Sequence, residues 1–155
     1  MDKKCLKVGE KAPDFSLIDH NEKKFRIFDY KGKRVLLSFH PLAWTGICSE
    51  QMKSLEKHFN DFEELNTVAV GINVDSIPSK KAWAETLGLK NTRLLSDFWP
   101  HGEVSDLYNL FRDKQGFSER ANVIINKDQE IEFIRVYEIG ELPDIDEILT
   151  FLREL

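Results

Sequence analysis

The sequence predicts an α/β fold in which helices flank a central mixed β-sheet. Three observations lead to this prediction: a strand pair opens the chain, strands and helices then alternate, and a second strand pair and a last helix follow. The chain has 155 residues, and we expect residues 1–155 to form a single domain. Hydrophobic residues make up 41% of the chain, which is enough to bury a core and excludes an intrinsically disordered protein.

Strands are predicted where short runs of bulky or β-branched residues lie between turn-forming residues. The first two runs flank the polar segment 19–24 and predict an N-terminal β-hairpin, and the last two flank the turn 126–129. The predicted strands cover residues 15–18, 25–27, 35–39, 67–74, 94–95, 121–125 and 131–137.

Helices are predicted where apolar residues recur every three or four positions. The clearest one runs from about Cys48 to Leu65, with polar residues on its other faces. Its apolar stripe consists of Cys48, Met52, Leu55, Phe59 and Phe62. The other predicted helices cover residues 79–87 between Pro78 and Gly88, residues 103–111, and the segment that starts at Pro143.

Charge and cysteine content exclude several classes of protein. The chain has 22 Lys and Arg against 27 Asp and Glu, a net charge of -5, which argues against nucleic acid as a partner. No apolar run approaches the ~20 residues that span a bilayer, and the N-terminus lacks the apolar region of a signal peptide. Two cysteines, Cys5 and Cys48, are too few for a disulfide framework. We therefore expect a soluble cytoplasmic protein without a membrane partner.

The segment from Phe39 to Cys48 is the best candidate for a reactive site. It leaves a buried strand, turns at Pro41 and enters a helix at Cys48, which places the thiol where open α/β sheets bind ligands. A helix N-terminus favours the thiolate, the nucleophilic form of a cysteine. The Thr45 hydroxyl can donate to the sulfur, or to an oxygen that approaches the sulfur, while also serving the helix end. Pro41 can shield the sulfur without competing for a hydrogen bond, because it has no N–H group.

Other interpretations of these residues have less support. Cys48 alone would more often be a buried structural thiol. His40 either lines the pocket of the thiol or packs at the end of its strand, and a Cys48–His40 hydrolase dyad has no third residue to orient it. His20, His58 and His101 do not cluster with the cysteines at zinc-ligand spacing, so we expect no metal site.

The pattern Pro41-x-x-x-Thr45-x-x-Cys48 resembles the active-site motif of the peroxiredoxins, the thioredoxin-fold thiol peroxidases. The resemblance extends over nearly the whole chain, because residues 8–15, Ser96-Asp97 and residues 118–126 are also similar to segments of that family. Within the family, residues 41–48 and 96–102 are most similar to the alkyl hydroperoxide reductase E-type branch, which is often of one-cysteine design.

This resemblance implies a thioredoxin-like fold and a peroxidase that reduces hydrogen peroxide or organic hydroperoxides in antioxidant defence, without a cofactor. It implies that Cys48 attacks a peroxide oxygen and becomes a sulfenic acid. Thr45 would hold the peroxide, and Arg120 would stabilise the thiolate and then the leaving oxygen. The backbone N–H groups of Ile47 and Cys48 would bind the substrate, and Pro41 would cover the pocket.

The second half of such a cycle needs another thiol. Lys53 stands where some peroxiredoxins have a resolving cysteine, and no cysteine follows Cys48. We therefore expect an external reductant, either a small thiol or a thioredoxin- or glutaredoxin-like protein, with a Cys5–Cys48 disulfide as the alternative. Gln51 stands where a glutamate is frequent in the family, so the resemblance assigns it no role.

Two further expectations concern assembly and the competing class of function. Trp44, Trp83, Phe98 and Trp99 are expected in the core or at an interface, and the resemblance implies a homodimer formed by the loops around the site. The competing class is a thioredoxin-like thiol–disulfide or interaction module without peroxidase activity. A Cys-x-x-Cys pair would favour that class, but residue 51 is Gln51.

Overall fold

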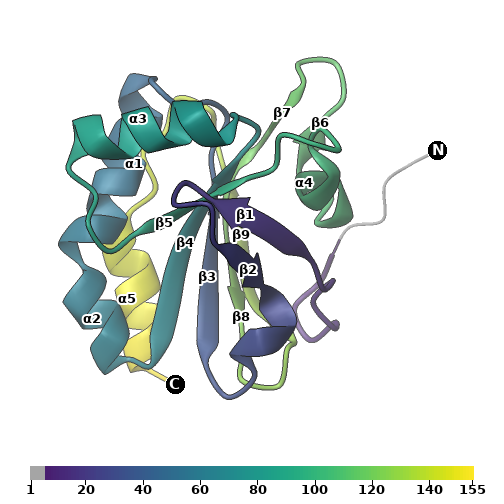
Figure 1. The fold of residues 1–155 in the computed structure, drawn as a ribbon. Helices are drawn as coiled ribbons and strands as arrows, with labels where there is room; N and C mark the ends of the chain where they lie inside the picture. The colour runs from purple at the N-terminus through teal and green to yellow at the C-terminus, as the bar shows by residue number, and fades with distance from the viewer. Residues whose placement is uncertain (1–5) are drawn as a thin grey trace.

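The computed structural model describes residues 6–155 and confirms an α/β fold with a mixed sheet (Figure 1). Cys5 lies outside the described residues. Seven strands form the sheet in the order β2-β1-β5-β4-β3-β8-β9. They are β1 Ser16–Asp19, β2 Lys24–Arg26, β3 Arg34–Phe39, β4 Thr67–Asn73, β5 Arg93–Ser96, β8 Arg120–Ile125 and β9 Ile131–Tyr137.

The centre of the sheet consists of the parallel strands β3, β4 and β5, and antiparallel strands extend it on both sides. Leu37 of β3 pairs with Val70 of β4 and with Val123 of β8, so hydrophobic residues meet in the middle of the sheet. All residues of β8 and nearly all of β3 are buried, because helices and loops cover both faces. The predicted N-terminal hairpin is confirmed as β1 and β2, which pair in an antiparallel manner.

Helices cover the two faces unequally (Figure 1). On one face α1, α2, α3 and α5 enclose a core that includes Leu36, Met52, Trp83 and Ile148. On the other face α4 and the 3-10 helix η1 Ile27–Tyr30 pack over a second core. The α-helices are α1 Gly46–Lys57, α2 Phe59–Glu64, α3 Ile77–Leu87, α4 Glu103–Leu107 and α5 Ile145–Arg153. None of the helices in residues 6–155 is long and apolar enough to span a membrane.

Two predicted helices have boundaries that differ from those in the structure. The helix predicted over 48–65 is divided at His58 into α1 and α2, and Phe59 is consequently only half-buried. The helix predicted to reach Phe111 ends at Leu107, because Asn109 has a left-handed φ of 58°. Residues 111–118 instead form a small hairpin of two strands, β6 Phe111–Arg112 and β7 Phe117–Ser118.

The last helix begins two residues after Pro143. The Asp144 side chain accepts a hydrogen bond of 3.0 Å from the backbone N–H of Asp146, and this cap sets the first turn of α5.

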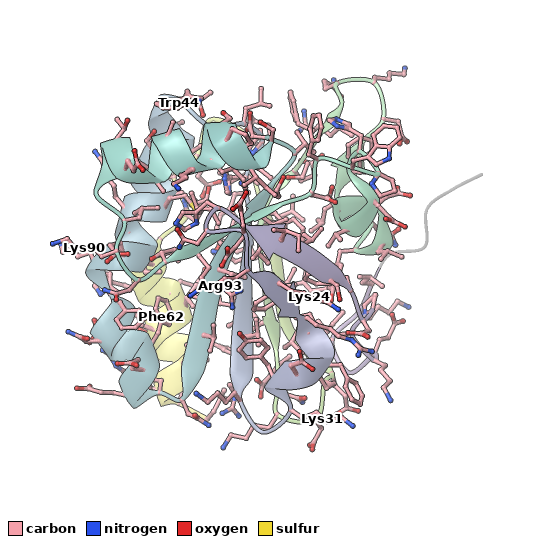
Figure 2. The ribbon with its side chains drawn as sticks, in the orientation of Figure 1. Lys24, Lys31, Trp44, Phe62, Lys90 and Arg93 are labelled. Atoms are coloured by element: carbon pink, nitrogen blue, oxygen red, sulfur yellow. The ribbon has the colours of Figure 1, made fainter. Side chains whose placement is uncertain are left out.

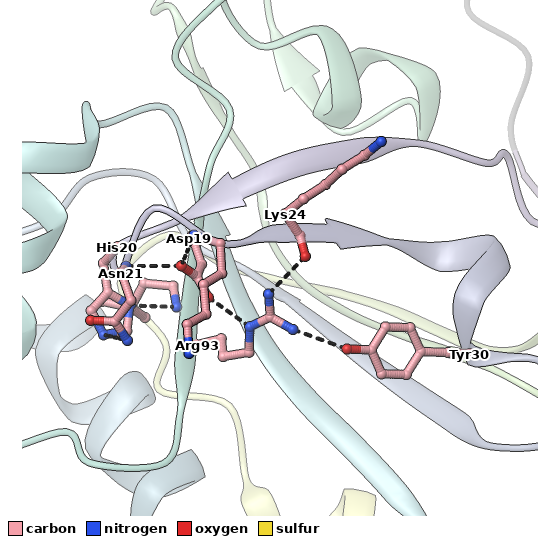
Figure 3. Close-up of polar contacts among 8 residues, drawn as sticks. Asp19, His20, Asn21, Lys24, Tyr30 and Arg93 are labelled. Atoms are coloured by element: carbon pink, nitrogen blue, oxygen red, sulfur yellow. Dashed lines mark hydrogen bonds and ion pairs between the residues drawn. The ribbon is translucent and has the colours of Figure 1, made fainter.

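A polar network ties the N-terminal hairpin to β5 (Figure 3). Arg93 Nε donates to the buried carboxylate of Asp19 at 2.7 Å, Nη1 donates to the Tyr30 hydroxyl at 2.9 Å, and Nη2 donates to the Lys24 carbonyl at 3.2 Å. Burial acts to raise the pKa of Asp19, but hydrogen bonds from Lys23, Arg93 and Asn21 outweigh it and leave this pKa lowered. The Arg93–Asp19 ion pair and the hydrogen bond from Arg93 to Lys24 therefore link β1 and β2 to β5, the outermost of the parallel strands.

Candidate active site

Cys48 is the third residue of α1, as the sequence predicts for a cysteine in the first helical turn. The helix follows β3 through residues 40–45, and Trp44 turns the chain with a left-handed φ of 70°. The Trp44 indole donates to Ser79 Oγ at 3.0 Å, which ties this turn to α3. Figure 2 shows Trp44 beside α3 at the edge of the molecule. Cys48 is fully buried, and its thiol is free.

Arg120 lies beside the sulfur, although the two residues are 72 positions apart in the chain. Because Phe39 at the end of β3 pairs with Ala121, Arg120 at the start of β8 reaches the first turn of α1. Its Nη1 atom lies 3.3 Å from Cys48 Sγ. Nε and Nη2 donate to the Ile139 carbonyl at 3.0 and 2.8 Å, so the guanidinium group has a fixed orientation.

Gln51 fixes the same guanidinium group from α1, a role that the sequence interpretation missed. Its Oε1 accepts from Arg120 Nη1 at 2.8 Å, and its Nε2 donates to Ser38 Oγ at 2.7 Å and to the Phe39 carbonyl at 3.1 Å. The spacing of three residues from Cys48 was the available signal, since it places both side chains on one face of a helix. Gln51 therefore links Arg120 to the end of β3 without adding a charge.

Thr45 occupies the N-cap position of α1, but its side chain does not cap the helix. The hydroxyl donates to the Leu42 carbonyl at 3.0 Å. It therefore neither donates to the sulfur nor accepts from a helix N–H group, the two roles that the sequence suggested. The reason is the turn at Trp44, which brings the Leu42 carbonyl within reach. The Thr45 carbonyl accepts hydrogen bonds from Ser49 N at 2.9 Å and from Ser49 Oγ at 2.8 Å.

A cavity of about 430 Å³ lies over this group of residues. Pro41, Thr45, Ile47 and Arg120 all contribute to it, so the structure brings four of the sequence-predicted residues to one site. The remaining lining residues are Leu42, Gly46, Phe117, Ile139 and Gly140. Cys48 lies behind the lining, in contact with Arg120. A larger cavity of about 570 Å³ lies near the start of β4 and contains none of these residues.

His40 does not line this cavity. The ring is fully buried at the end of β3, with its centroid 5.4 Å from that of Trp83 and Nδ1 3.3 Å from the Ser38 carbonyl. Burial is the main reason that the pKa of His40 lies well below its ordinary value, and the charges of Lys80 and Arg120 act in the same direction. In this structure His40 therefore packs at the end of its strand against Trp83 and is not among the residues that line the cavity.

The described residues contain no candidate metal site. Within residues 6–155, no three His, Cys, Asp or Glu side chains come together in a way that could hold a metal ion.

Comparisons with known proteins agree with this geometry. A sequence model of the AhpC/TSA family matches residues 8–134. Alkyl hydroperoxide reductase E from Mycobacterium tuberculosis is 40% identical over 140 residues, which cover 90% of this chain and 91% of the relative. The chloroplastic 2-Cys peroxiredoxin BAS1 of Spinacia oleracea is 33% identical over 158 residues, which cover 96% of this chain and 59% of the relative.

Solved structures support the same relationship. The reduced 2-Cys peroxiredoxin of Plasmodium vivax superposes with a TM-score of 0.86 at 30% sequence identity, covering 94% of this chain and 80% of that chain. The peroxiredoxin neighbours have the thioredoxin fold, so the predicted thioredoxin-like architecture is confirmed. The matched family, the identity to these relatives and the shared fold show that this chain belongs to the AhpC/TSA family and is a peroxiredoxin.

Proposed function

We propose that this peroxiredoxin reduces hydrogen peroxide or organic hydroperoxides at Cys48 and that an external thiol restores the oxidised cysteine. Relatives named alkyl hydroperoxide reductase and thioredoxin-dependent peroxide reductase support thiol-dependent peroxide reduction as the reaction class. The observation that carries the residue assignment is the 3.3 Å contact between Arg120 Nη1 and Cys48 Sγ behind a cavity lined by Pro41 and Thr45.

The proposed reaction is a displacement at oxygen. The Cys48 thiolate attacks one peroxide oxygen, an S–O bond forms and the O–O bond breaks. The sulfur is oxidised by two electrons to the sulfenic acid, and the peroxide is reduced to water or to an alcohol. The other oxygen leaves with the electron pair of the broken bond and takes up a proton.

Arg120 is suited to both charges of this reaction. A guanidinium group that already points at the sulfur stabilises the thiolate, and it can donate to the leaving oxygen as negative charge develops there. Hydrogen bonds to Gln51 and to the Ile139 carbonyl fix its orientation, so little reorganisation is needed during the reaction. The N–H groups of Ile47 and Cys48 lie in the first turn of α1, where helix donors have no partner inside the helix.

Thr45 is placed to bind the substrate as an acceptor. Its hydroxyl proton is directed to the Leu42 carbonyl, which leaves oxygen lone pairs for the O–H group of a peroxide. The adjoining walls from Leu42, Ile47 and Ile139 are apolar and give an alkyl group of an organic hydroperoxide a place to pack.

Recycling by an external thiol agrees with the surroundings of Cys48. Lys53 lies one turn and a half further along α1, so this helix offers no second thiol there. The Drosophila melanogaster relative is named a thioredoxin-dependent peroxide reductase, which makes a thioredoxin-like protein one candidate reductant. A small thiol that enters the cavity is the other.

We further propose a homodimer built on the exposed aromatic residues near the site. Trp44, Phe98 and Trp99 are 53%, 50% and 78% exposed, and a cavity of about 410 Å³ lies beside Phe98 and Trp99. Sedimentation velocity of Trp99→Ser tests this proposal, because a wild-type dimer that persists in the variant would argue against this surface.

We also propose a cytoplasmic location, which cell fractionation tests, and a single domain over residues 1–155, which limited proteolysis tests.

Stopped-flow tryptophan fluorescence tests the central proposal, since Trp44 lies four residues from Cys48. Reduced protein mixed with one equivalent of peroxide should lose one thiol rapidly, and the product mass should match a sulfenic acid. Cys48→Ser should abolish the reaction, and the matched variant Cys5→Ser should keep it. Oxidation as slow as that of free cysteine would refute peroxidase activity, and a quantitative Cys5–Cys48 disulfide would refute recycling by an external thiol.

A further inference from the structure

Lys80 is a fully buried lysine that the reaction described above does not use. It lies in α3, and its side chain points into the molecule. The Nζ atom donates to Asn73 Oδ1 at the end of β4, so an amide oxygen and not a carboxylate accepts this hydrogen bond. Burying an ammonium group whose hydrogen-bond acceptor is a neutral amide oxygen is costly.

Lys80 stands at one end of a chain of hydrogen bonds that reaches residues 40–45 between β3 and α1, the active-site loop. Asn73 Nδ2 donates to Asp75 Oδ2 at 2.8 Å, and the same carboxylate oxygen accepts from the backbone N–H of Ala43 at 2.7 Å. Ala43 lies between Pro41 and Thr45 in the sequence. The ammonium group is therefore connected, through two side chains, to the backbone that forms the cavity over Cys48.

Titratable groups from five parts of the fold interact electrostatically with Lys80. Burial lowers its pKa to about 7, while the negative charges of Asp75, Asp97 and Cys48 act in the opposite direction. Two histidines also face it: the Lys80 charge contributes to the lowered pKa values of His40, after β3, and of His20, after β1. Cys48 is thus among the groups whose charge acts on the ammonium group of Lys80.

We propose that Lys80 is a positioning residue of the peroxidatic site, whose ammonium group stabilises the Cys48 thiolate through space and holds the active-site loop through Asn73 and Asp75. Arg120 contacts the sulfur from β8, whereas Lys80 acts from α3 and the end of β4. A buried interaction of this kind persists without contact, because the protein interior screens charges less than water does. The proposal rests on the proposed role of Cys48 as a thiolate nucleophile.

The pH dependence of Cys48 alkylation tests the charge of Lys80. Iodoacetamide reacts with the thiolate, and a Cys5→Ser background leaves Cys48 as the reacting thiol. Lys80→Gln should raise the pH midpoint of alkylation by about one unit, which slows the reaction about tenfold at a pH well below the midpoint. The difference from wild type should shrink above pH 7, where Lys80 loses its proton.

Matched variants separate charge from packing. Lys81→Gln changes the exposed lysine next to Lys80 and should leave the midpoint unchanged. Lys80→Arg keeps a positive charge and should restore most of the reactivity. A folded Lys80→Gln protein with the wild-type midpoint would refute the proposal, and so would a folded Lys80→Arg protein that behaves like Lys80→Gln.

A reciprocal measurement needs no change at Lys80. If the thiolate and the ammonium group stabilise each other, removal of the thiolate must lower the pKa of Lys80. The ¹³Cε NMR shift of Lys80 can be followed in wild type and in Cys48→Ser, because ordinary lysines titrate near 10.4 and Lys80 near 7. An unchanged titration of Lys80 would overturn the proposal. Neither measurement involves peroxide. If Lys80 and Cys48 influence each other as expected but the protein consumes no peroxide, only the proposed function is refuted.

Discussion

Replacing Gln51 with methionine removes the amide that links Arg120 to the end of β3. The two side chains have similar volumes, so the main change is the loss of hydrogen bonds at 2.8 Å to Arg120, 2.7 Å to Ser38 and 3.1 Å to the Phe39 carbonyl. Arg120 keeps its two bonds to the Ile139 carbonyl and stays near the sulfur, but Nη1 loses its anchor.

The size of the effect follows from the groups that lose a partner. A buried polar group without a partner costs about 1–3 kcal/mol, and the Arg120 N–H and the Ser38 hydroxyl are both buried. With two such groups, the free energy of unfolding should fall by about 2–6 kcal/mol. The peroxide reaction should slow by about tenfold, equivalent to ~1.4 kcal/mol, because the guanidinium group is less well oriented toward the reacting atoms.

Gln129→Met is the matched control. Gln129 is also buried, and its Nε2 donates to the Ile27 carbonyl at 3.1 Å, outside the cavity at Cys48. Urea unfolding should show a loss of stability in both variants, whereas stopped-flow fluorescence should show slower oxidation only in Gln51→Met. A folded Gln51→Met protein with the wild-type oxidation rate, or an equal slowing in Gln129→Met, would refute the anchoring role of Gln51.

Three other changes have defined outcomes. Arg120→Met should slow the peroxide reaction by about 10²–10³ and raise the pH midpoint of Cys48 alkylation, and an unchanged rate would remove this residue from the site. Thr45→Val should slow the reaction about tenfold with little change in urea unfolding, because the hydroxyl is exposed; equal rates would argue against substrate binding by Thr45. Asp19→Asn should destabilise the protein above about pH 4, and the difference from wild type should vanish as the pH falls below that value, since this carboxyl has a lowered pKa and its contribution is lost on protonation. A difference that stays constant in acid unfolding experiments would contradict the Arg93–Asp19 interpretation.

Local spacing explains why much of the site could be predicted. Pro41, Thr45 and Cys48 lie on one short segment between a strand and a helix, so their positions follow from where β3 ends and α1 begins. Arg120 is distant in sequence, and only its resemblance to a family segment placed it at the site. The division between α1 and α2 at His58 was less predictable. The residues on both sides of His58 suit a helix, so the residue types do not show where one helix ends and the next begins.

His40 and Gln51 show what spacing could not decide. His40 follows an almost completely buried strand, and whether its ring turns to the cavity or to Trp83 depends on the packing of α3 against the sheet. Gln51 had the correct spacing for contact with the neighbourhood of Cys48. Its hydrogen-bond partners, however, lie in β3 and β8. Sequence spacing does not show that these two strands and α1 come together, because this depends on the tertiary structure.

Lys80 had a readable signal, because it precedes the buried residues Trp83 and Ala84 by three and four positions and thus shares their helix face. The two cations near Cys48 then differ in one consequential way. A guanidinium group stays charged at every pH at which the protein is folded, so Arg120 gives the thiolate constant support. Lys80 has a pKa of about 7, so its support weakens as the pH rises through neutrality. The reactivity of Cys48 should therefore change around neutral pH as Lys80 loses its proton. This change should persist in Arg120→Met and disappear in Lys80→Gln.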